Sequence, residues 1–220
     1  NGAASVVGPE VLRTLGVNVI PINVDPDGIS INENAGSTHM EGLREAVKKY
    51  GADAGIANDG DADRCLFTDE NGNDLDGDQI MLLCARHLKE QGRLAKNMIV
   101  GTVMSNIGFH KAAHELGMET CQTAVGDRYV LERMRADGYS IGGEQSGHVI
   151  FLDYNSTGDG LLTAVQMLSI MKQTGQKLSE LAGIMTKYPQ LLVNVRVVTK
   201  TGWEDNPLIQ AEISEATREL

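Results

Sequence analysis

Apolar and polar positions alternate along this chain with two different periods, which together predict an α/β protein. Short apolar runs bounded by turn residues indicate strands, and longer segments with apolar residues three or four apart indicate helices. The segment 40–50, for example, places Leu43, Val47 and Tyr50 on one helical face. We expect strands at 17–20, 53–57, 65–68, 98–101, 118–121, 139–142, 148–152 and 191–198. We expect helices at 9–15, 40–50, 79–91, 109–116, 129–136, 160–173 and 178–186, and a charged helix that ends at Leu220.

The order loop, helix, glycine and strand occurs twice in the sequence. Residues 5–20 contain it with Gly16 ahead of the strand, and residues 105–121 repeat it with Gly117. Because glycine commonly ends a helix in the left-handed conformation, both copies predict βαβ units. The second copy follows an apolar strand, whereas the first starts at Asn1 with no strand before it. We therefore expect the first unit to lack its opening strand.

Composition and charge exclude some classes of function. A chain of 220 residues exceeds the usual domain size of about 100–150 residues, which favours two domains. Hydrophobic residues make up 41 %, enough for a core, whereas aromatic residues make up only 4 % and the net charge is −11. Few stacking rings and a negative field argue against a nucleic-acid-binding protein. An anionic ligand would have to be held by local positive groups.

The cysteines and the apolar runs favour a cytoplasmic protein. Cys65, Cys84 and Cys121 lie far apart without a CxxC pair, as reduced thiols do, so neither a zinc site nor a disulfide framework is expected. No apolar run approaches the roughly 20 residues of a membrane span, and no signal peptide is recognisable. The first residue is not Met, which suggests that an N-terminal segment has been removed.

The most informative motif is an acidic loop, Asp59-Gly60-Asp61-Ala62-Asp63-Arg64, which follows the strand predicted at 53–57. Its three carboxylates repel one another unless a cation lies among them. A hard divalent ion suits such oxygen ligands, and Mg²⁺ does so especially when phosphate completes its coordination. Arg64 cannot ligate a cation, but it can hold a phosphate beside one. The simpler alternative is a solvated acidic turn.

An EF-hand is a second alternative, because it also spaces acidic ligands at alternate positions and would use Glu70 as its last ligand. The position that needs glycine in that motif is occupied by Arg64, however, and the preceding segment is a predicted strand instead of a helix. We therefore favour a magnesium site.

A second cluster, residues 142–148, lies between two predicted strands. Its glycines let the backbone approach a ligand closely, and Glu144, Ser146 and His148 offer a carboxylate, a hydroxyl and a titratable imidazole. This mixture suits sugar hydroxyls and a proton-transfer step. A tight β-turn with ordinary surface polar residues explains it equally well.

Two further loops stand at predicted helix starts. In the loop 123–129, Arg128 and backbone N–H groups could form an anion-binding site, although we favour Asp127 as a helix cap paired with Arg128. In the loop 155–160 no P-loop lysine follows the glycines, so we expect Asp159 simply to cap its helix. Asp78 is expected to cap the helix 79–91 in the same way.

Taken together, these motifs resemble the α-D-phosphohexomutase family. The acidic loop is similar to the family's metal loop, and Gly143-Glu144-Gln145-Ser146-Gly147-His148 is similar to its sugar-recognition loop in the members that act on glucosamine phosphates. The similarity runs essentially end to end, with further matches at 36–39, 125–129 and 189–195. One departure is Asn58, where the family usually has an apolar or aromatic residue.

The resemblance implies a role for each candidate residue. Asp59, Asp61 and Asp63 would bind Mg²⁺ together with a phosphoserine oxygen. Arg64 and His148 would be catalytic, the first by orienting the phosphoserine or substrate phosphate and the second by proton transfer or substrate positioning. The residues that would bind substrate are Glu144, Ser146, His148 and Arg128.

The resemblance also implies an activity, the interconversion of glucosamine 6-phosphate and glucosamine 1-phosphate through a bisphosphorylated intermediate, for cell-wall precursor synthesis. Glucosamine or glucose 1,6-bisphosphate would activate the complete enzyme, the substrate would be a phosphosugar, and a homodimer is possible. Neither nucleic acid nor membrane is an expected partner.

The resemblance further implies that the chain is incomplete. The family has four domains of mixed three-layer α/β type, and the residues 1–75, 76–187 and 188–220 resemble the second, the third and the start of the fourth. The phosphoserine of domain 1 and the phosphate clamp of domain 4 have no counterpart here, so we expect this chain to be inactive alone. The alternatives are a phosphomannomutase/phosphoglucomutase, disfavoured by Gln145 and residues 36–39, a non-catalytic Ca²⁺-binding module, and a sugar-phosphate-binding scaffold.

Overall fold

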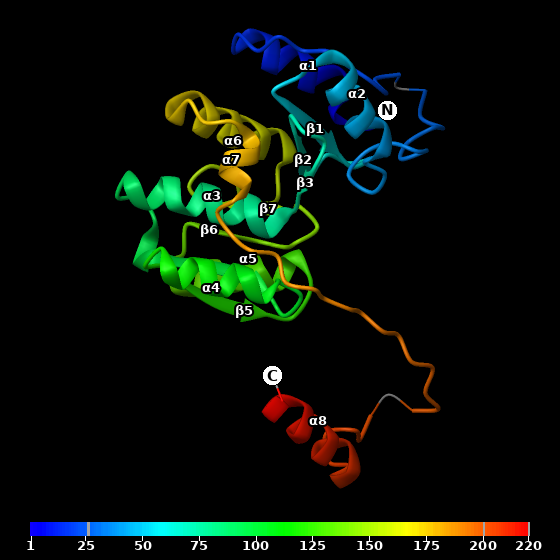
Figure 1. Ribbon diagram of the computed structural model, residues 1–220, viewed down its shortest axis with the longest axis vertical. Helices are drawn as coiled ribbons and strands as arrows, with labels where there is room; N and C mark the ends of the chain where they lie inside the picture. The colour runs from blue at the N-terminus through cyan, green and yellow to red at the C-terminus, as the bar shows by residue number, and fades with distance from the viewer. Residues whose placement is uncertain (26, 200, 220) are drawn as a thin grey trace. The chain divides into compact units, whose positions relative to one another are not determined.

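Two sheets of different kinds organise the larger of two structural units, Asn1–Tyr188, and a smaller unit comprises Pro189–Leu220 (Figure 1). The computed structural model describes residues 1–25, 27–199 and 201–219. Its strands are β1 (Ala54–Asn58), β2 (Cys65–Asp69), β3 (Asp74–Leu75), β4 (Met98–Thr102), β5 (Glu119–Thr123), β6 (Ile141–Gly143) and β7 (Val149–Phe151). Its helices are α1 (Ala4–Thr14), α2 (Glu41–Tyr50), α3 (Gly77–Glu90), the 3₁₀ turn η1 (Ala95–Asn97), α4 (Ile107–Glu115), α5 (Asp127–Asp137), α6 (Gly160–Thr174), α7 (Leu178–Ala182) and α8 (Pro207–Glu219). The α/β class expected from the sequence is confirmed.

The four-stranded sheet has the order β5-β4-β6-β7 and lies between helical layers. β4 pairs in parallel with both β5 and β6, whereas β7 returns antiparallel to β6. Val100 and Ile150 pack into a cluster with Val130 and Met134 of α5. Ile99 is on the opposite face, because successive strand residues alternate, and it joins the core formed with α3 and α4. The β4-α4-β5 repeat therefore confirms the second predicted βαβ unit.

The three-stranded sheet, β1-β2-β3, is antiparallel throughout. Gly55 of β1 faces α2, so closely that a Cβ atom there would lie 2.7 Å from Val47 Cγ2. The β2–β3 turn is held by Asp69, whose Oδ1 accepts hydrogen bonds from the backbone N–H groups of Asn71 (2.9 Å) and Asn73 (2.8 Å). β2 and β3 thus form a hairpin closed by this turn.

One continuous apolar core joins the two sheets. Phe67 and Leu75 from the first sheet and Ile99 and Ile141 from the second belong to the same buried cluster. Helix α3 contacts strands of both sheets and packs against α6, which covers β1 and β2. The shared core consequently fixes the positions of the loops at the ends of the two sheets relative to each other.

Two predicted strands do not form among the described residues. The segment 17–20 belongs to no sheet, although the helix and the glycine before it are present as α1 and Gly16 (φ +84°). The physical reason is that a strand needs a partner: β5, its counterpart in the second unit, pairs with β4, whereas no strand pairs with 17–20 among the described residues.

The segment 191–198 likewise has no strand partner in the described part of the smaller unit. Its apolar side chains face solvent, with Leu191 86 % exposed and Val198 fully exposed. The only regular element described in this unit is α8, as the charged composition predicts. Alternation alone therefore did not produce a strand here.

The helix caps agree with the sequence at one position and differ at another. Asp159 caps α6 as expected, because its Oδ1 accepts a hydrogen bond from the Leu162 N–H at 2.9 Å. The cap of α3, however, is Asp76 in a reciprocal capping box with Gln79, and not Asp78. Helix α7 ends at Ala182, earlier than predicted. None of the helices in the described residues is long and apolar enough to cross a membrane.

The shared core predicts the cost of a large-to-small substitution. Phe67 is fully buried in the core that the two sheets share, so Phe67→Ala should lower the free energy of unfolding by about 3–5 kcal/mol through lost burial and a residual cavity. Leu15→Ala, at a site that is 58 % exposed, serves as the control and should cost far less. Denaturant unfolding followed by circular dichroism measures both, and equal effects would contradict the shared core.

Candidate metal centre and the loops that face it

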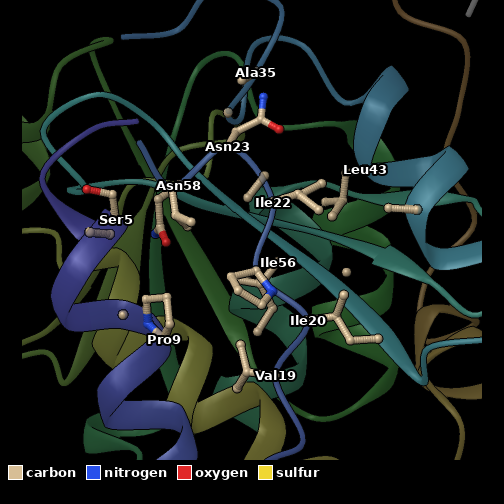
Figure 2. A pocket seen from close by; sticks show the side chains of 18 of the residues that line it. Ser5, Pro9, Val19, Ile20, Ile22, Asn23, Ala35, Leu43, Ile56 and Asn58 are labelled. Atoms are coloured by element: carbon tan, nitrogen blue, oxygen red, sulfur yellow. The ribbon is translucent and has the colours of Figure 1, made fainter. Parts of the chain in front are cut away.

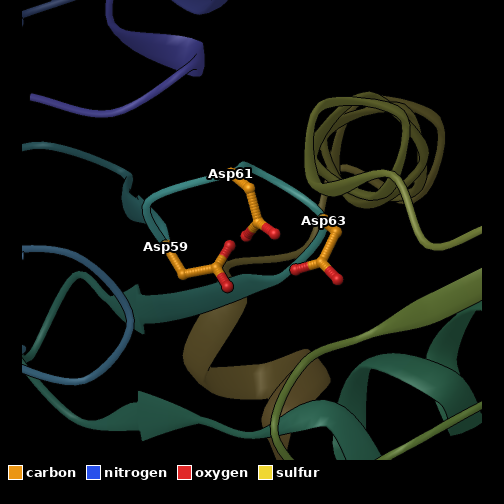
Figure 3. Close-up of side chains that lie close together, drawn as sticks. All are labelled: Asp59, Asp61 and Asp63. Atoms are coloured by element: carbon orange, nitrogen blue, oxygen red, sulfur yellow. The ribbon is translucent and has the colours of Figure 1, made fainter. Parts of the chain in front are cut away.

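The acidic loop 59–64 closes the β1–β2 hairpin. Asn58 and Cys65 are the last paired residues before it, so the six loop residues project from the end of the first sheet. Asp59, Asp61 and Asp63 each offer a carboxylate oxygen, and these oxygens lie within 4.8 Å of one another (Figure 3). Asp61 is exposed, whereas Asp59 and Asp63 are half-buried. The loop therefore gathers its three carboxylates toward one point.

Backbone contacts hold the loop in this shape. The Arg64 N–H donates to Asp59 Oδ1 (3.1 Å), and Asn58 Nδ2 donates to the Arg64 carbonyl (2.8 Å). The Gly160 N–H donates to the Ala62 carbonyl at 2.9 Å, which ties the start of α6 to the loop. A Cβ atom on Gly160 would lie 2.3 Å from the Arg64 oxygen and from Asn58 Nδ2. The polar side chain of Asn58 is thus explained by its hydrogen bond across the base of the loop.

The electrostatics of the loop fit a bound cation. Burial, together with repulsion from the neighbouring Asp63 and Asp61, raises the pKa of Asp59 to about 6. Arg64 offsets part of this charge, with Nε 3.7 Å from Asp59 Oδ2 and 4.0 Å from Asp63 Oδ1. Neither Arg64 Nε nor Asp63 Oδ1 makes a hydrogen bond within the described chain, although both atoms are buried. An all-oxygen site with excess negative charge suits Mg²⁺ or Ca²⁺ better than a soft metal.

The loop 143–148 is joined to the acidic loop through the backbone. Arg64 and His148 form an antiparallel β-bridge, and the Cys65 N–H donates to the Gly147 carbonyl at 3.0 Å. Gly147 has φ +94°, and a Cβ atom there would lie 2.6 Å from the Cys65 oxygen. Only glycine fits this crossing without displacing a strand. The two clusters singled out in the sequence, some 80 residues apart, are therefore neighbours.

His148 is buried beside the carboxylates. Its side chain is 3 % exposed, with Nε2 3.4 Å from Asp63 Oδ2 and 4.0 Å from Asp127 Oδ2. Gly158 packs against the ring so tightly that a Cβ atom would lie 2.4 Å from Nε2. The structure thus places His148 in the acidic cluster.

Glu144 and Ser146 differ in their surroundings. Glu144 is half-buried, and its Oε1 accepts a hydrogen bond from the Gly126 N–H at 2.9 Å. Ser146 is exposed at the tip of the loop. The Glu144 carboxylate therefore links the loop 143–148 to the turn before α5.

Arg128 is not brought together with the other candidates. Its side chain is 80 % exposed, and Nε donates to Glu132 Oε1 at 2.8 Å, one turn along α5. Gly126 is the N-cap position of α5, and Asp127 is its first residue. The favoured interpretation of Asp127 as a cap paired with Arg128 is therefore wrong, because Gly126 holds the cap position and Arg128 pairs with Glu132.

Asp78 positions the loop 143–148, a role different from the helix cap predicted for it. Its Oδ2 accepts hydrogen bonds from the Asn106 N–H (2.7 Å) and from Gln145 Nε2 (3.4 Å), while the Gly77 N–H donates to the Gln145 carbonyl (2.9 Å). Burial raises the pKa of Asp78 to about 6. The signal available in the sequence was Asp76 three residues before Gln79, which is a capping-box spacing and leaves Asp78 free for another role.

The fold and the site together define a helix-flanked α/β protein that carries a candidate divalent-metal loop. Models of phosphoglucomutase/phosphomannomutase alpha/beta/alpha domains II and III match residues 1–72 and 76–188 respectively. The chain belongs to the phosphoglucomutase/phosphomannomutase family, as the resemblance of the two loops implied.

Curated relatives and solved structures agree with this membership. The chain is 53 % identical to the phosphoglucosamine mutase of Bacillus subtilis (strain 168) and 56 % identical to that of Clostridium novyi (strain NT), over all of its 220 residues. It covers 49 % of each, so the chain spans about half the length of these relatives.

Among solved structures, a phosphoglucomutase/phosphomannomutase family protein from Burkholderia thailandensis matches with a TM-score of 0.75 and 27 % identity, over 83 % of this chain and 40 % of that one. Aspergillus fumigatus N-acetylphosphoglucosamine mutase, solved with GlcNAc-6P and magnesium, matches with a TM-score of 0.67 and 20 % identity. That match covers 89 % of this chain and 50 % of the other and supports the fold alone.

The buried carboxyl of Asp78 predicts a pH dependence of stability. In the folded chain it keeps its proton up to about pH 6, whereas in the unfolded chain it loses it near the ordinary value of 3.8. The free energy of unfolding should therefore fall as pH rises from about 4 to about 6, by up to roughly 3 kcal/mol from this group. Asp78→Asn should remove that part of the fall.

Urea unfolding at a series of pH values measures the effect. The exposed Asp53 is the matched control, and Asp53→Asn should keep the wild-type profile. A profile of Asp78→Asn that runs parallel to the wild type would show that Asp78 titrates normally.

Proposed function

We propose that this chain carries the metal-binding and sugar-facing parts of a phosphoglucosamine mutase, which interconverts glucosamine 6-phosphate and glucosamine 1-phosphate by phosphoryl transfer. The observation that carries the proposal is the backbone bridge between Arg64 and His148, which joins the carboxylate loop to the loop 143–148. Identity of 52–56 % to phosphoglucosamine mutases over the whole chain supports the choice of glucosamine.

Asp59, Asp61 and Asp63 would hold Mg²⁺, because they supply only oxygen ligands and already repel one another. When bound, Mg²⁺ would offset the negative charge that collects on a transferring phosphoryl group. Arg64 would orient the phosphate beside the ion, since its Nε makes no hydrogen bond within the described chain and its side chain is 40 % exposed.

The sugar would be recognised by the loop 143–148. Ser146 is exposed and free to meet a hydroxyl, whereas Glu144 can share its second carboxylate oxygen while Oε1 keeps the Gly126 N–H. His148, held 3.4 Å from Asp63, would transfer a proton or position the substrate. Arg128 would contact substrate after exchanging its exposed partner Glu132 for a phosphate.

The remaining parts of the active site would come from the rest of a longer polypeptide. We divide the chain into domain 2 (1–75), domain 3 (76–187) and the start of domain 4 (188–220), and we assign the phosphoserine to domain 1 and a phosphate clamp to domain 4. The chain alone would then bind metal without catalysing turnover. Activation by glucosamine or glucose 1,6-bisphosphate, a cytoplasmic location and a homodimer belong to this proposal for the whole enzyme.

Metal binding can be tested on the chain itself. Isothermal titration calorimetry should detect Mg²⁺ binding that Asp61→Asn weakens at least about tenfold, because one of three anionic ligands is lost. Asp61 is exposed, so this variant should fold normally. Asp53→Asn, a charge change outside the loop, should bind like the wild type. Tight Ca²⁺-selective binding without phosphate would instead support the non-catalytic calcium module.

Activity requires the complete enzyme. A polypeptide that adds the serine-containing domain and the rest of domain 4 should turn over glucosamine 6-phosphate faster than mannose or glucose 6-phosphate, with Mg²⁺ and a bisphosphate activator present. The 220-residue chain in the same coupled assay should show no sustained turnover. Turnover by the chain alone would refute the division of the active site, and preference for mannose or glucose phosphate would refute the choice of sugar.

A further inference from the structure

The acidic loop 59–64 has surroundings of two kinds. An apolar groove of about 260 Å³, walled by α1, the segment 17–24, α2 and β1, adjoins the base of the loop at Asn58 and Asp59. Ile20, Leu43 and Ile56 are among the apolar residues that line it (Figure 2). No residue of the loop 143–148 lines this groove, and its apolar wall does not suit a phosphorylated sugar. The polar ligand of the site therefore belongs beside the loop 143–148.

Buried polar atoms without partners gather where the two loops meet. In the described residues, seven buried side-chain polar atoms make no hydrogen bond, and four of them belong to Asp63, Arg64 and His148. The His148 side chain is only 3 % exposed, and neither of its ring nitrogens has a hydrogen-bond partner there. Buried polar groups are nearly always satisfied by protein, by water or by a ligand. The cluster thus indicates a polar ligand at this place.

Asp127 joins this cluster from the start of α5. Its Oδ2 lies 4.0 Å from Nε2 of His148, the ring nitrogen that also faces the acidic loop. The backbone at this point is held on both sides: the Gly126 N–H donates to Glu144 Oε1 at 2.9 Å, and Val130 is fully buried in the core beneath α5. The Asp127 side chain is nevertheless 62 % exposed. Its carboxylate is therefore fixed in place and open to a ligand.

The helix start alone does not account for Asp127. A carboxylate in the first turn is favoured by the helix dipole, and at the cap position it also accepts a hydrogen bond from an N–H of that turn. Within the described chain Asp127 accepts no such bond, because the N–H groups of Tyr129 and Val130 donate to the Gly126 carbonyl at 3.0 Å and 3.4 Å. The dipole explains why an aspartate is tolerated here, but it leaves both carboxylate oxygens without a hydrogen-bond donor.

The charge of the cluster selects the kind of ligand. Asp127 and Glu144 add two carboxylates to the three of the acidic loop, and Arg64 is the cation that lies against that loop. Even with a divalent ion bound, this side of the site keeps an excess of negative charge. The phosphate of a sugar phosphate adds more, whereas the protonated amine of an amino sugar offsets it. An amine is thus the substrate group that a free carboxylate recognises best.

We propose that Asp127 binds the protonated amine of the sugar and thereby sets a preference for amino-sugar phosphates over the corresponding hydroxyl sugars. This inference rests on the proposed function and names the residue that reads the amine. Asp127 fits the role better than Glu144, because one Glu144 oxygen is already bound to the Gly126 N–H. The other Glu144 oxygen and Ser146 then read hydroxyls that glucosamine and glucose share.

The test compares two substrates of the complete enzyme in the coupled assay. Asp127→Asn keeps the size of the side chain and removes its charge. It should lower kcat/KM for glucosamine 6-phosphate at least about tenfold and change that for glucose 6-phosphate by no more than about twofold. Glu144→Gln should instead lower both values in similar proportion. The matched control is Glu41→Gln, which neutralises an exposed carboxylate in the first turn of α2 and should keep the wild-type ratio.

The ratio of the two kcat/KM values decides between the possible outcomes. An equal loss with both substrates in Asp127→Asn would overturn the proposal, because a structural or general catalytic role gives that result. A selective loss of glucosamine 6-phosphate in Glu144→Gln alone would assign the amine to Glu144. A wild-type enzyme without preference for glucosamine would refute the choice of sugar in the proposed function, whereas a wild-type preference that survives Asp127→Asn would refute the role of Asp127 alone.

Discussion

The antiparallel bridge between Arg64 and His148 is the contact on which the candidate site depends. It joins the end of the first sheet to the hairpin of the second, and it brings three carboxylates, an arginine and a buried histidine to one place. Gly147 makes the crossing possible, and Gly160 ties α6 to the acidic loop from the other side. These backbone contacts leave the side chains free for a ligand, as a preorganised site requires.

The same closeness creates the electrostatic character of the site. Asp59 and Asp78 are buried carboxyls whose pKa values are both raised to about 6, but they serve different ends. Asp59 lies in a cluster that a cation would relieve, whereas Asp78 satisfies an N–H of Asn106 and holds Gln145. A bound cation would therefore relieve the repulsion at Asp59, whereas Asp78 stabilises the loop 143–148, which lies beside the acidic loop.

The shared apolar core also explains how the first sheet keeps its order. The shared core of Phe67, Leu75 and the helices α3 and α6 holds β1–β3 together, although the outer edge of β1 pairs with no strand among the described residues. That core explains how an apolar groove can coexist with an ordered acidic loop only one strand away. The loop depends on the β1–β2 pairing, and the groove lies beyond the opposite edge of β1.

The sequence by itself determined the features that arise locally: the alternation of helices and strands, the glycines that end helices, the cap at Asp159 and the gathering of three carboxylates in the acidic loop. Only the tertiary structure decided the features that depend on a partner distant in the sequence. Residues 17–20 and 191–198 have strand-like patterns but pair with no strand in the part of the chain that the structure describes, and Asp78 binds Gln145 instead of capping α3. The 3.4 Å contact between His148 and Asp63 also spans more than 80 residues of sequence. Periodicity and capping act within a few residues, whereas strand pairing and buried contacts depend on chain segments that folding brings together.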